Sequence, residues 1–254
     1  MHAVFKLRKV LAGALMSAVL VGTAVAGDLQ VLSAGAIEPG LNAAAAAFEK
    51  QTGHAVNITF NTAPELKKRM ATGSTFDVVI APPTVLGEFA AAGKLAETRA
   101  NVGRVGVGVA VRKGAPRPDI TSLATLKQSM LAADALVFNR ASTGLYVEGL
   151  LKKMHIDEAV EGRTTRYVDG AAVMLHVIKG RGREIGLGAM TEILLYQGKG
   201  LELVGPLPAE VQNYTSYSAA PLASSQQQEL AQTFVSFLAG SVAKPLFVAA
   251  GITD

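Results

Sequence analysis

The sequence of 254 residues contains no cysteine. A chain without thiols forms no disulfide scaffold, thiolate zinc site or iron–sulfur cluster, and it has no cysteine nucleophile. Charged residues are also few, at 17%, whereas 50% of the residues are apolar. This composition provides for a substantial buried core and excludes a disordered chain. The length suits one large domain or two domains of roughly 120 residues.

Histidine is equally scarce, with four residues in the chain. None stands in an H-x-x-H or H-E-x-x-H pattern, so we expect no metal site and no cofactor. His54 and His155 follow helix-like segments where solvent exposure is ordinary, and His176 lies on an apolar helix as a partly buried side chain. Basic residues cluster little beyond Arg181-Gly182-Arg183, which argues against nucleic-acid binding.

Net charge is distributed unevenly along the chain. The formal net charge is +4, but three basic residues stand within the first nine positions, before an uncharged stretch over 10–25 that ends in Ala24-Val25-Ala26. This order is typical of a secretory signal peptide, here cleaved after Ala26. The alternative is an uncleaved membrane anchor, although the stretch is short for a span of about 20 apolar residues. The mature chain then has a net charge of +1, and we expect it in the periplasm without membrane insertion.

Short apolar or β-branched stretches alternate with helical stretches over the rest of the chain, which is typical of βαβ units. The sequence predicts strands at 29–33, 55–60, 76–80, 135–138, 185–187 and 201–204. Helices are predicted at 42–50, 65–71, 84–93, 143–154, 171–178, 224–238 and 244–250. Two alternating segments, 104–112 and 211–219, predict longer extended strands between these units.

These two extended segments divide the chain into two α/β lobes. We expect lobe 1 to comprise residues 27–108 and 215–254, and lobe 2 to comprise residues 109–214. Each lobe holds a mixed, mostly parallel sheet flanked by helices, and the extended segments serve as two hinge strands. Ligands of open α/β sheets bind at the carboxyl ends of the strands, so the expected site is a cleft between lobes that can close.

Four loops that follow predicted strands and precede predicted helices form the candidate site. They span residues 33–38, 60–64, 139–144 and 169–171. Helix starts present N–H groups and the positive end of the helix dipole, which suits an anion. The alternative is that each loop is only a helix cap, but two such loops in each lobe favour an anion site. The predicted ligand-binding residues are Ser33, Ala36, Asn61, Thr62, Arg140, Ser142, Thr143, Gly144, Gly170 and Ala171.

Arg140 is the cation of this set. It follows a strand and precedes a helix start, where a guanidinium could clamp a carboxylate with two hydrogen bonds. Arginine side chains are ordinarily solvated, which is the alternative for Arg140. The neighbouring Ser142-Thr143-Gly144 favours the ligand role.

The order of these segments resembles a known family. A signal peptide is followed by L-Q-V-L-S-A-G-A-I-E-P, F-E-K-Q-T-G, V-N-I-T-F-N-T-A, F-D-V-V-I-A, R-V-G-V-G-V-A-V-R, A-S-T-G-L-Y and N-Y-T-S-Y-S. This order is similar to that of the type 2 periplasmic solute-binding proteins, above all the molybdate-binding-like branch of ABC importers. The resemblance covers the whole mature chain. It implies a two-lobed monomer that captures a small anion and delivers it to a permease and ATPase complex.

The sequence departs from the molybdate binders at the ligand. In those proteins two serines, main-chain N–H groups and a tyrosine hold the oxyanion. The resemblance places Ala36 at the first serine, Thr62 near the second and Ala189–Met190 at the tyrosine, so two side-chain ligands are missing. Because Arg140 adds a positive charge, these departures argue against molybdate and for a larger anion with carboxylate groups.

Aconitate isomerases resemble the same branch and provide the alternative function, the interconversion of trans- and cis-aconitate. Their allylic proton shift needs clamps for three carboxylates and one acid–base group. Arg140 is a candidate clamp and Glu38 a candidate base, although the helix dipole also favours a carboxylate in a first turn. Since fold alone does not decide function, we expect a binding protein first and an isomerase second.

Overall fold

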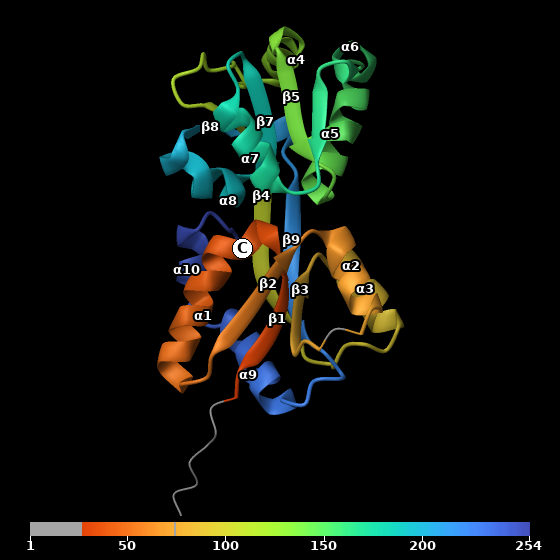
Figure 1. The fold of residues 1–254 in the computed structure, drawn as a ribbon, viewed down its shortest axis with the longest axis vertical. Coiled ribbons are helices and arrows are strands. Elements are labelled where there is room, and N and C mark those ends of the chain that lie inside the picture. The colour runs from red at the N-terminus through yellow and green to blue at the C-terminus, as the bar shows by residue number, and fades with distance from the viewer. Residues whose placement is uncertain (1–26, 74) are drawn as a thin grey trace, which may run out of the picture.

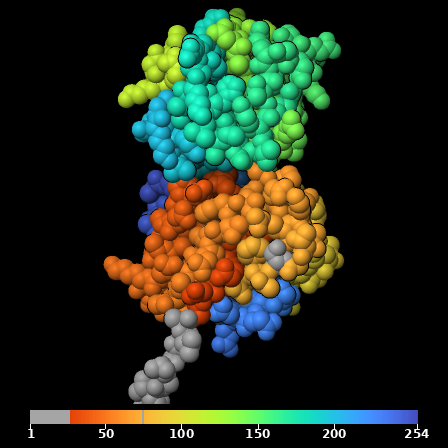
Figure 2. All heavy atoms as spheres, in the orientation of Figure 1, coloured from red at the N-terminus to blue at the C-terminus, as the bar shows by residue number. Residues whose placement is uncertain are grey.

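The computed structural model describes residues 27–73 and 75–254, so the signal peptide predicted at 1–26 lies outside the described residues. Two α/β lobes stand end to end and are joined by two long strands, β4 (Ala100–Arg112) and β9 (Tyr214–Pro221) (Figure 1). The space-filling view shows the lobes as two masses that meet along one boundary (Figure 2). The predicted two-lobed α/β fold is confirmed.

Lobe 1 is built on a mixed sheet in the order β2-β1-β3-β9-β4. Its parallel strands are β1 (Leu29–Ala34), β2 (Val56–Asn61) and β3 (Val78–Ala81), and β9 runs antiparallel to both β3 and β4. The helices of this lobe are α1 (Glu38–Thr52), α2 (Ala63–Ala71), α3 (Pro83–Ala91), α9 (Gln228–Leu238) and α10 (Ala243–Ala249).

Helix α1 shows how the local sequence determines an element of lobe 1. Alanine has the highest helix propensity, and the alanine-rich run after Asn42 buries small side chains against the sheet. Pro39 occupies the first turn, where its missing N–H has no intrahelical partner, and Gly53 ends the helix with a φ of 77°. The Phe48 ring meets the Phe234 ring edge-on, with centroids 5.0 Å apart, which joins α1 to α9.

Lobe 2 holds the second mixed sheet, in the order β4-β7-β5-β6 with β8 paired to β4. Strand β5 (Ala135–Asn139) is parallel to β6 (Thr164–Tyr167) and to β7 (Glu184–Ala189), whereas β7 and β8 (Leu201–Pro206) are antiparallel to β4. The helices are α4 (Leu123–Ala132), α5 (Ser142–Lys153), α6 (Asp157–Glu161), α7 (Gly170–Lys179) and α8 (Met190–Tyr196). The short 3₁₀ helices of lobe 2 are η2 (Gln197–Lys199) and η3 (Ala209–Val211), and η1 (Gly35–Ile37) follows β1 in lobe 1.

Strand β4 changes sheets in the middle of its Val/Gly alternation. Its pairing with β9 extends to Gly106↔Tyr214, and its pairing with β7 begins at Val107↔Ala189. The change of partner therefore falls between two adjacent residues of one strand. The lobe boundaries expected after residues 108 and 214 stay predictions, and they lie next to this crossover.

Several elements differ from the sequence prediction. Helices α4, α6 and α8 and strand β6 were not predicted, because most of them are short and β6 is a polar Thr-Thr-Arg-Tyr segment. Helix α9 begins at Gln228 rather than at Ser224, because the Ser225 hydroxyl donates to Asp77 Oδ1 at 2.5 Å and accepts from the Gln227 N–H at 3.0 Å.

Among the described residues, no single helix has the length and apolarity of a membrane span. Helices α9 and α10 reach that hydropathy only as a pair, and they are bent by 55° relative to each other. Their apolar residues, such as Phe234 and Phe247, belong to the core of lobe 1.

Candidate functional site

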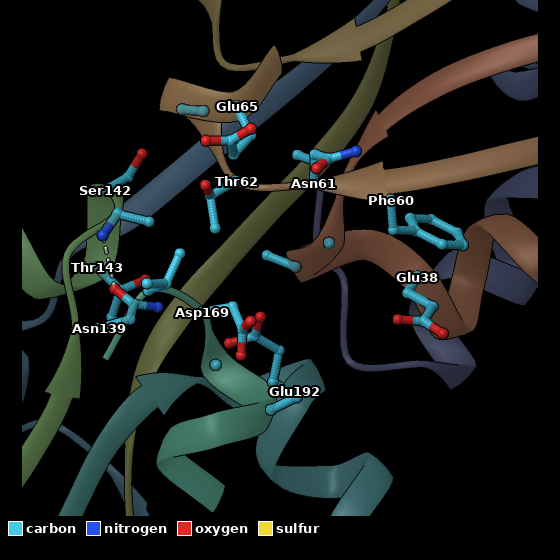
Figure 3. Close-up of a pocket in the computed structure, with 18 of the residues that line it drawn as sticks. Glu38, Phe60, Asn61, Thr62, Glu65, Asn139, Ser142, Thr143, Asp169 and Glu192 are labelled. Carbon is cyan, nitrogen blue, oxygen red and sulfur yellow. Dashed lines mark hydrogen bonds between the residues drawn. The ribbon is translucent and has the colours of Figure 1, made fainter. Parts of the chain in front are cut away.

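A cavity of about 280 Å³ lies between the lobes, where the carboxyl ends of the strands face each other. Lobe 1 contributes the residues that follow β1, β2 and β3, and lobe 2 contributes those that follow β5, β6 and β7. The close-up shows side chains from both lobes around this space (Figure 3). The polar and aromatic residues of the lining are Glu38, Phe60, Asn61, Thr62, Glu65, Asn139, Ser142, Thr143, Asp169, Glu192, Tyr196 and Tyr217.

Helices α2, α5, α7 and α8 all begin at this cavity. The N-cap residues of α2, α5 and α8 are Thr62, Ala141 and Ala189, and none of the three makes a side-chain cap hydrogen bond within the described residues. In α5, Asn139 instead engages one first-turn donor, the Gly144 N–H. Helix α7 differs, because Asp169 Oδ1 accepts from the Ala172 N–H at 2.8 Å. Uncapped helix starts present main-chain N–H donors, together with the positive end of the helix dipole. The backbone of both lobes is therefore suited to bind an anion.

Asn139 shapes the loop that leads into α5. It is buried, and its Oδ1 accepts from the Ala141 N–H at 3.0 Å and from the Gly144 N–H at 3.1 Å. A Cβ at Gly144 would overlap the Asn139 carbonyl group. This close approach explains why glycine occupies position 144, and it holds Ser142 and Thr143 at the cavity wall.

The side-chain charges of the cavity are acidic. Four carboxylates line it, Glu38, Glu65, Asp169 and Glu192, and none of the described lining residues is lysine, arginine or histidine. Each stands at the cap or in the first turn of a helix, where the dipole favours a negative charge. Attraction for an anion must therefore come from main-chain and neutral side-chain donors.

Glu192 is the most strongly perturbed of these carboxylates. Its Oε2 atom is shielded from solvent and has no hydrogen-bond partner among the described residues. Burial raises the pKa of Glu192 from 4.5 to about 7, with help from the negative charges of Asp169 and Glu38 and against the opposing effect of a hydrogen bond to the Ala189 backbone. The side chain is therefore a mixture of acid and carboxylate near neutral pH.

Asn61 and Tyr217 add neutral polar groups from lobe 1. The Asn61 Nδ2 atom is also shielded and has no partner among the described residues. Burial raises the pKa of Tyr217 well above its usual value, so its hydroxyl stays protonated. An unpaired buried donor destabilises a protein by about 1–3 kcal/mol. Asn61 in lobe 1 and Glu192 in lobe 2 thus present unsatisfied polar atoms at one cavity.

Thr191 connects the two walls of the site. Its side chain is fully buried, and its hydroxyl donates to the carbonyl of Ala36 in η1. The start of α8 in lobe 2 is thereby bound to the loop after β1 in lobe 1.

Most of the residues predicted from the sequence lie together at this cavity. The structure places seven of the ten predicted ligand residues, and the candidate base Glu38, in the lining. Those seven are Ala36, Asn61, Thr62, Ser142, Thr143, Gly170 and Ala171. Ser33 is fully buried in β1 and donates to the Ala34 carbonyl at 3.2 Å, and Gly144 lies behind Asn139.

Arg140 lies outside the cavity. Its backbone N–H donates to the Tyr167 carbonyl at 2.8 Å, and its exposed side chain lines a separate surface depression with Glu148 and Glu161. The loop turns at this position, so the side chain points away from the space that Ser142 and Thr143 face. The structure therefore provides no arginine clamp in the cavity.

Sequence reasoning missed Glu192 because it missed α8. The segment M-T-E-I-L-L-Y forms a helix of seven residues directly after β7. The signal was present, since a carboxylate in the first turn after a strand repeats the placement of Glu38 and Glu65. Tyr217 was missed as a site residue because 211–219 was interpreted as a hinge strand only.

No group of three or more histidine, aspartate or glutamate side chains in the described part of the chain is arranged to hold a metal ion. The four acidic side chains of the cavity are therefore too dispersed to form a metal site.

The fold and the cleft define a two-lobed solute-binding protein of the periplasmic type. Its chain belongs to the family described as bacterial extracellular solute-binding protein, whose model matches residues 29–253. The predicted resemblance is confirmed.

The proteins to which this chain is similar include both binding proteins and an enzyme. The periplasmic molybdate-binding protein of Azotobacter vinelandii has a TM-score of 0.71 and 20% identity, covering 89% of this chain and 99% of that one. The sulfate-binding protein SubI of Mycobacterium tuberculosis H37Rv has a TM-score of 0.70 and 16% identity, covering 89% and 86%. An aconitate isomerase from a Pseudomonas species is 29% identical over 218 residues, which are 83% of this chain and 82% of the isomerase. The structural likenesses establish the fold alone.

Proposed function

We propose that this protein captures a small organic anion with carboxylate groups in the cleft between its lobes. The observation that carries the proposal is the set of neutral donors at the cavity: the Asn61 amide and the first-turn main-chain N–H groups of α2 in lobe 1 and α5 in lobe 2, whose N-cap residues make no side-chain cap hydrogen bond in the described part of the chain. A carboxylate accepts hydrogen bonds from such donors without a cationic partner.

The size of the cavity favours an organic acid over a tetrahedral oxyanion. Its volume of about 280 Å³ is close to the lower end of the roughly 300–1,000 Å³ that small-molecule pockets occupy. A bare oxyanion would leave much of this space to solvent, whereas a di- or tricarboxylate could reach the donors of both lobes. The apolar carbons of such a ligand would contact Phe60, Val168 and Leu195, which also line the cavity.

We further infer a role in transport. Contacts to both lobes favour the closed arrangement, because a ligand shifts a conformational equilibrium by its differential affinity for the two states. In the periplasm, the closed form would dock on the permease of an ABC importer whose ATPase drives uptake. The predicted partners are thus the anion, the permease and the ATPase.

Thermal shift and titration calorimetry of the mature protein test the binding proposal. The probes are succinate, citrate, trans-aconitate, molybdate and sulfate. A carboxylate present at 100 times its Kd should stabilise the protein by about 2.7 kcal/mol. Tight binding of molybdate or sulfate, with no response to the carboxylates, would contradict the proposal.

A second candidate function is the isomerisation of an unsaturated tricarboxylate, favoured by the aconitate isomerase relative and by Glu192. In an allylic shift, the Glu192 carboxylate would take a proton from the substrate methylene as the double bond moves, and would return it to the former vinylic carbon. Atoms and electrons balance without a cofactor, and a pKa near 7 suits an acid–base group. We rank this function second, because none of the described residues that line the cavity is a cation that could stabilise the carbanion.

Product analysis separates the two functions. The protein is incubated with trans-aconitate, and cis-aconitate is measured by chromatography alongside binding. Conversion that Glu192→Gln abolishes while binding persists would establish the isomerase. Binding without conversion would leave the solute-binding function.

A further inference from the structure

We propose that Glu192 enters the ligand complex as its neutral acid, donates its proton in a hydrogen bond to the bound carboxylate, and makes capture proton-coupled. This inference rests on the proposed function, because it assigns a role to Glu192 in binding the same anion.

The Glu192 carboxyl group occupies a niche formed by three glycines. A Cβ at Gly170 would overlap the carboxyl group, one at Gly188 would stand 3.9 Å from Oε2, and one at Gly35 would stand 4.0 Å from Oε1. These glycines belong to α7, β7 and η1, so the niche includes backbone from both lobes. Because glycine has no side chain, these three positions leave room for the Glu192 carboxyl group. The Oε2 atom of Glu192 has no hydrogen-bond partner among the described residues.

The charges around this niche are acidic or neutral on every side. Asp169 faces Glu192 from the start of α7, and Glu38 faces it from α1. Tyr196 of α8 and Tyr217 of β9 are the other titratable groups, and the charge of Glu192 helps to raise the pKa of each. Figure 3 shows the Asp169 and Glu192 side chains close together at the cavity. No described group in this set supplies a positive charge to hold Glu192 ionised.

An arriving carboxylate would add a further negative charge at this wall. Ionised Glu192 would repel it, whereas the neutral acid supplies a donor for its oxygen. A hydrogen bond between a carboxylic acid and a carboxylate is charge-assisted and about twice as strong as a neutral one. Ligand binding should therefore draw one proton from solvent wherever Glu192 is ionised beforehand.

The expected effect follows from linkage between binding and protonation. With a pKa of about 7 in the free protein, Glu192 is mostly neutral at pH 6 and mostly ionised at pH 8. If only the neutral form binds, the Kd should be about tenfold weaker at pH 8 than at pH 6. Proton uptake should be about 0.5 per ligand at pH 7 and about 0.9 at pH 8.

Titration calorimetry of the mature protein at pH 6, 7 and 8 tests the inference, with citrate, succinate and trans-aconitate as probes. Parallel titrations in PIPES and Tris give the number of protons taken up, since these buffers differ in ionisation heat. Glu192→Gln keeps a donor and removes the titration, so it should bind at pH 8 as at pH 6. The titration of the ligand itself is common to both proteins and cancels in the comparison.

Glu229→Gln is the matched control, because it removes an exposed carboxylate from the first turn of α9, outside the cavity. This variant should keep the proton uptake of the wild type. Binding with the same pH dependence in wild type and Glu192→Gln would overturn the inference and leave the proposed function intact. Failure of every carboxylate probe to bind at any pH, with both proteins folded by circular dichroism, would overturn both.

Discussion

The burial of Glu192 predicts how the free energy of unfolding of the ligand-free protein depends on pH. The pKa of Glu192 is about 7 in the folded protein and 4.5 without the fold, so the folded chain holds this proton more tightly. Below pH 4.5 both states carry the proton and the group has no effect. As the pH rises from 4.5 to 7 the unfolded chain loses its proton while the folded chain keeps it, so the free energy of unfolding falls over this range and levels off above it.

The magnitude follows from the two pKa values. One pKa unit corresponds to about 1.36 kcal/mol, so the full penalty above pH 7 is about 3 kcal/mol. Between pH 5 and pH 8 the loss is about 2–3 kcal/mol, because the unfolded group is already largely ionised at pH 5. Glu192→Gln resembles the protonated side chain and should not show this loss.

Urea denaturation of both proteins at pH 5 and pH 8 measures the effect. The change in unfolding free energy between the two pH values should be about 2–3 kcal/mol less favourable for the wild type than for Glu192→Gln. All other titrating groups are shared, so they cancel in this double difference. Glu229→Gln, treated in the same way, should follow the wild type. Equal pH dependence in wild type and Glu192→Gln would refute the assignment of a raised pKa to Glu192.

Three further predictions concern residues around the cleft. Gly144→Ala places a methyl group against the Asn139 carbonyl and should lower the unfolding free energy, measured in urea, by more than about 2 kcal/mol. Gly149→Ala in the same helix has open space around it and should raise the unfolding free energy by roughly 0.5–1 kcal/mol. Similar effects of the two substitutions would show that the Asn139 contact does not constrain the loop. Arg140→Ala should change the carboxylate affinity measured by calorimetry by less than about twofold, because the exposed charge of Arg140 is screened over a Debye length of about 8 Å. A tenfold loss of affinity would show that the guanidinium contacts the ligand. Thr191→Val removes the buried donor to the Ala36 carbonyl and should lower the unfolding free energy by about 1–3 kcal/mol. Thr233→Val, on an exposed helix face, should change the unfolding free energy by no more than about 0.5 kcal/mol. Equal losses in the two variants would show that the hydrogen bond between the lobes does not stabilise the fold.

The architecture could be predicted from the sequence because the patterns that indicate its helices and strands are local. The alternation in 104–112 and the alanine run of α1 depend on neighbours in the chain, and both predicted their elements. The helix starts at Thr62 and Ser142 also followed from strand–loop–helix order, which brings them to one edge of the sheets.

The orientation of side chains was not predictable in the same way. Arg140 stands one residue after β5, yet its side chain lines a separate surface depression rather than the cavity that Ser142 and Thr143 line. Glu192 acquires its unusual pKa first from burial, which no local pattern indicates, and then from the charges of Asp169 and Glu38, which are remote in sequence. Chemistry that depends on such tertiary neighbours emerges only from the folded chain.

The passage of β4 and β9 between the lobes also constrains the order in which the chain can fold. Lobe 2 is one continuous stretch and can assemble from its own residues. Lobe 1 needs β9, and its strand β4 is held at Arg104 by backbone hydrogen bonds to Thr253, with N–O distances of 2.7 and 2.9 Å. These contacts join residues about 150 positions apart, and contacts of such high sequence separation slow folding. The lobe 1 wall of the cavity is therefore built on a sheet that closes only when β9 and Thr253 meet strands from the first half of the chain.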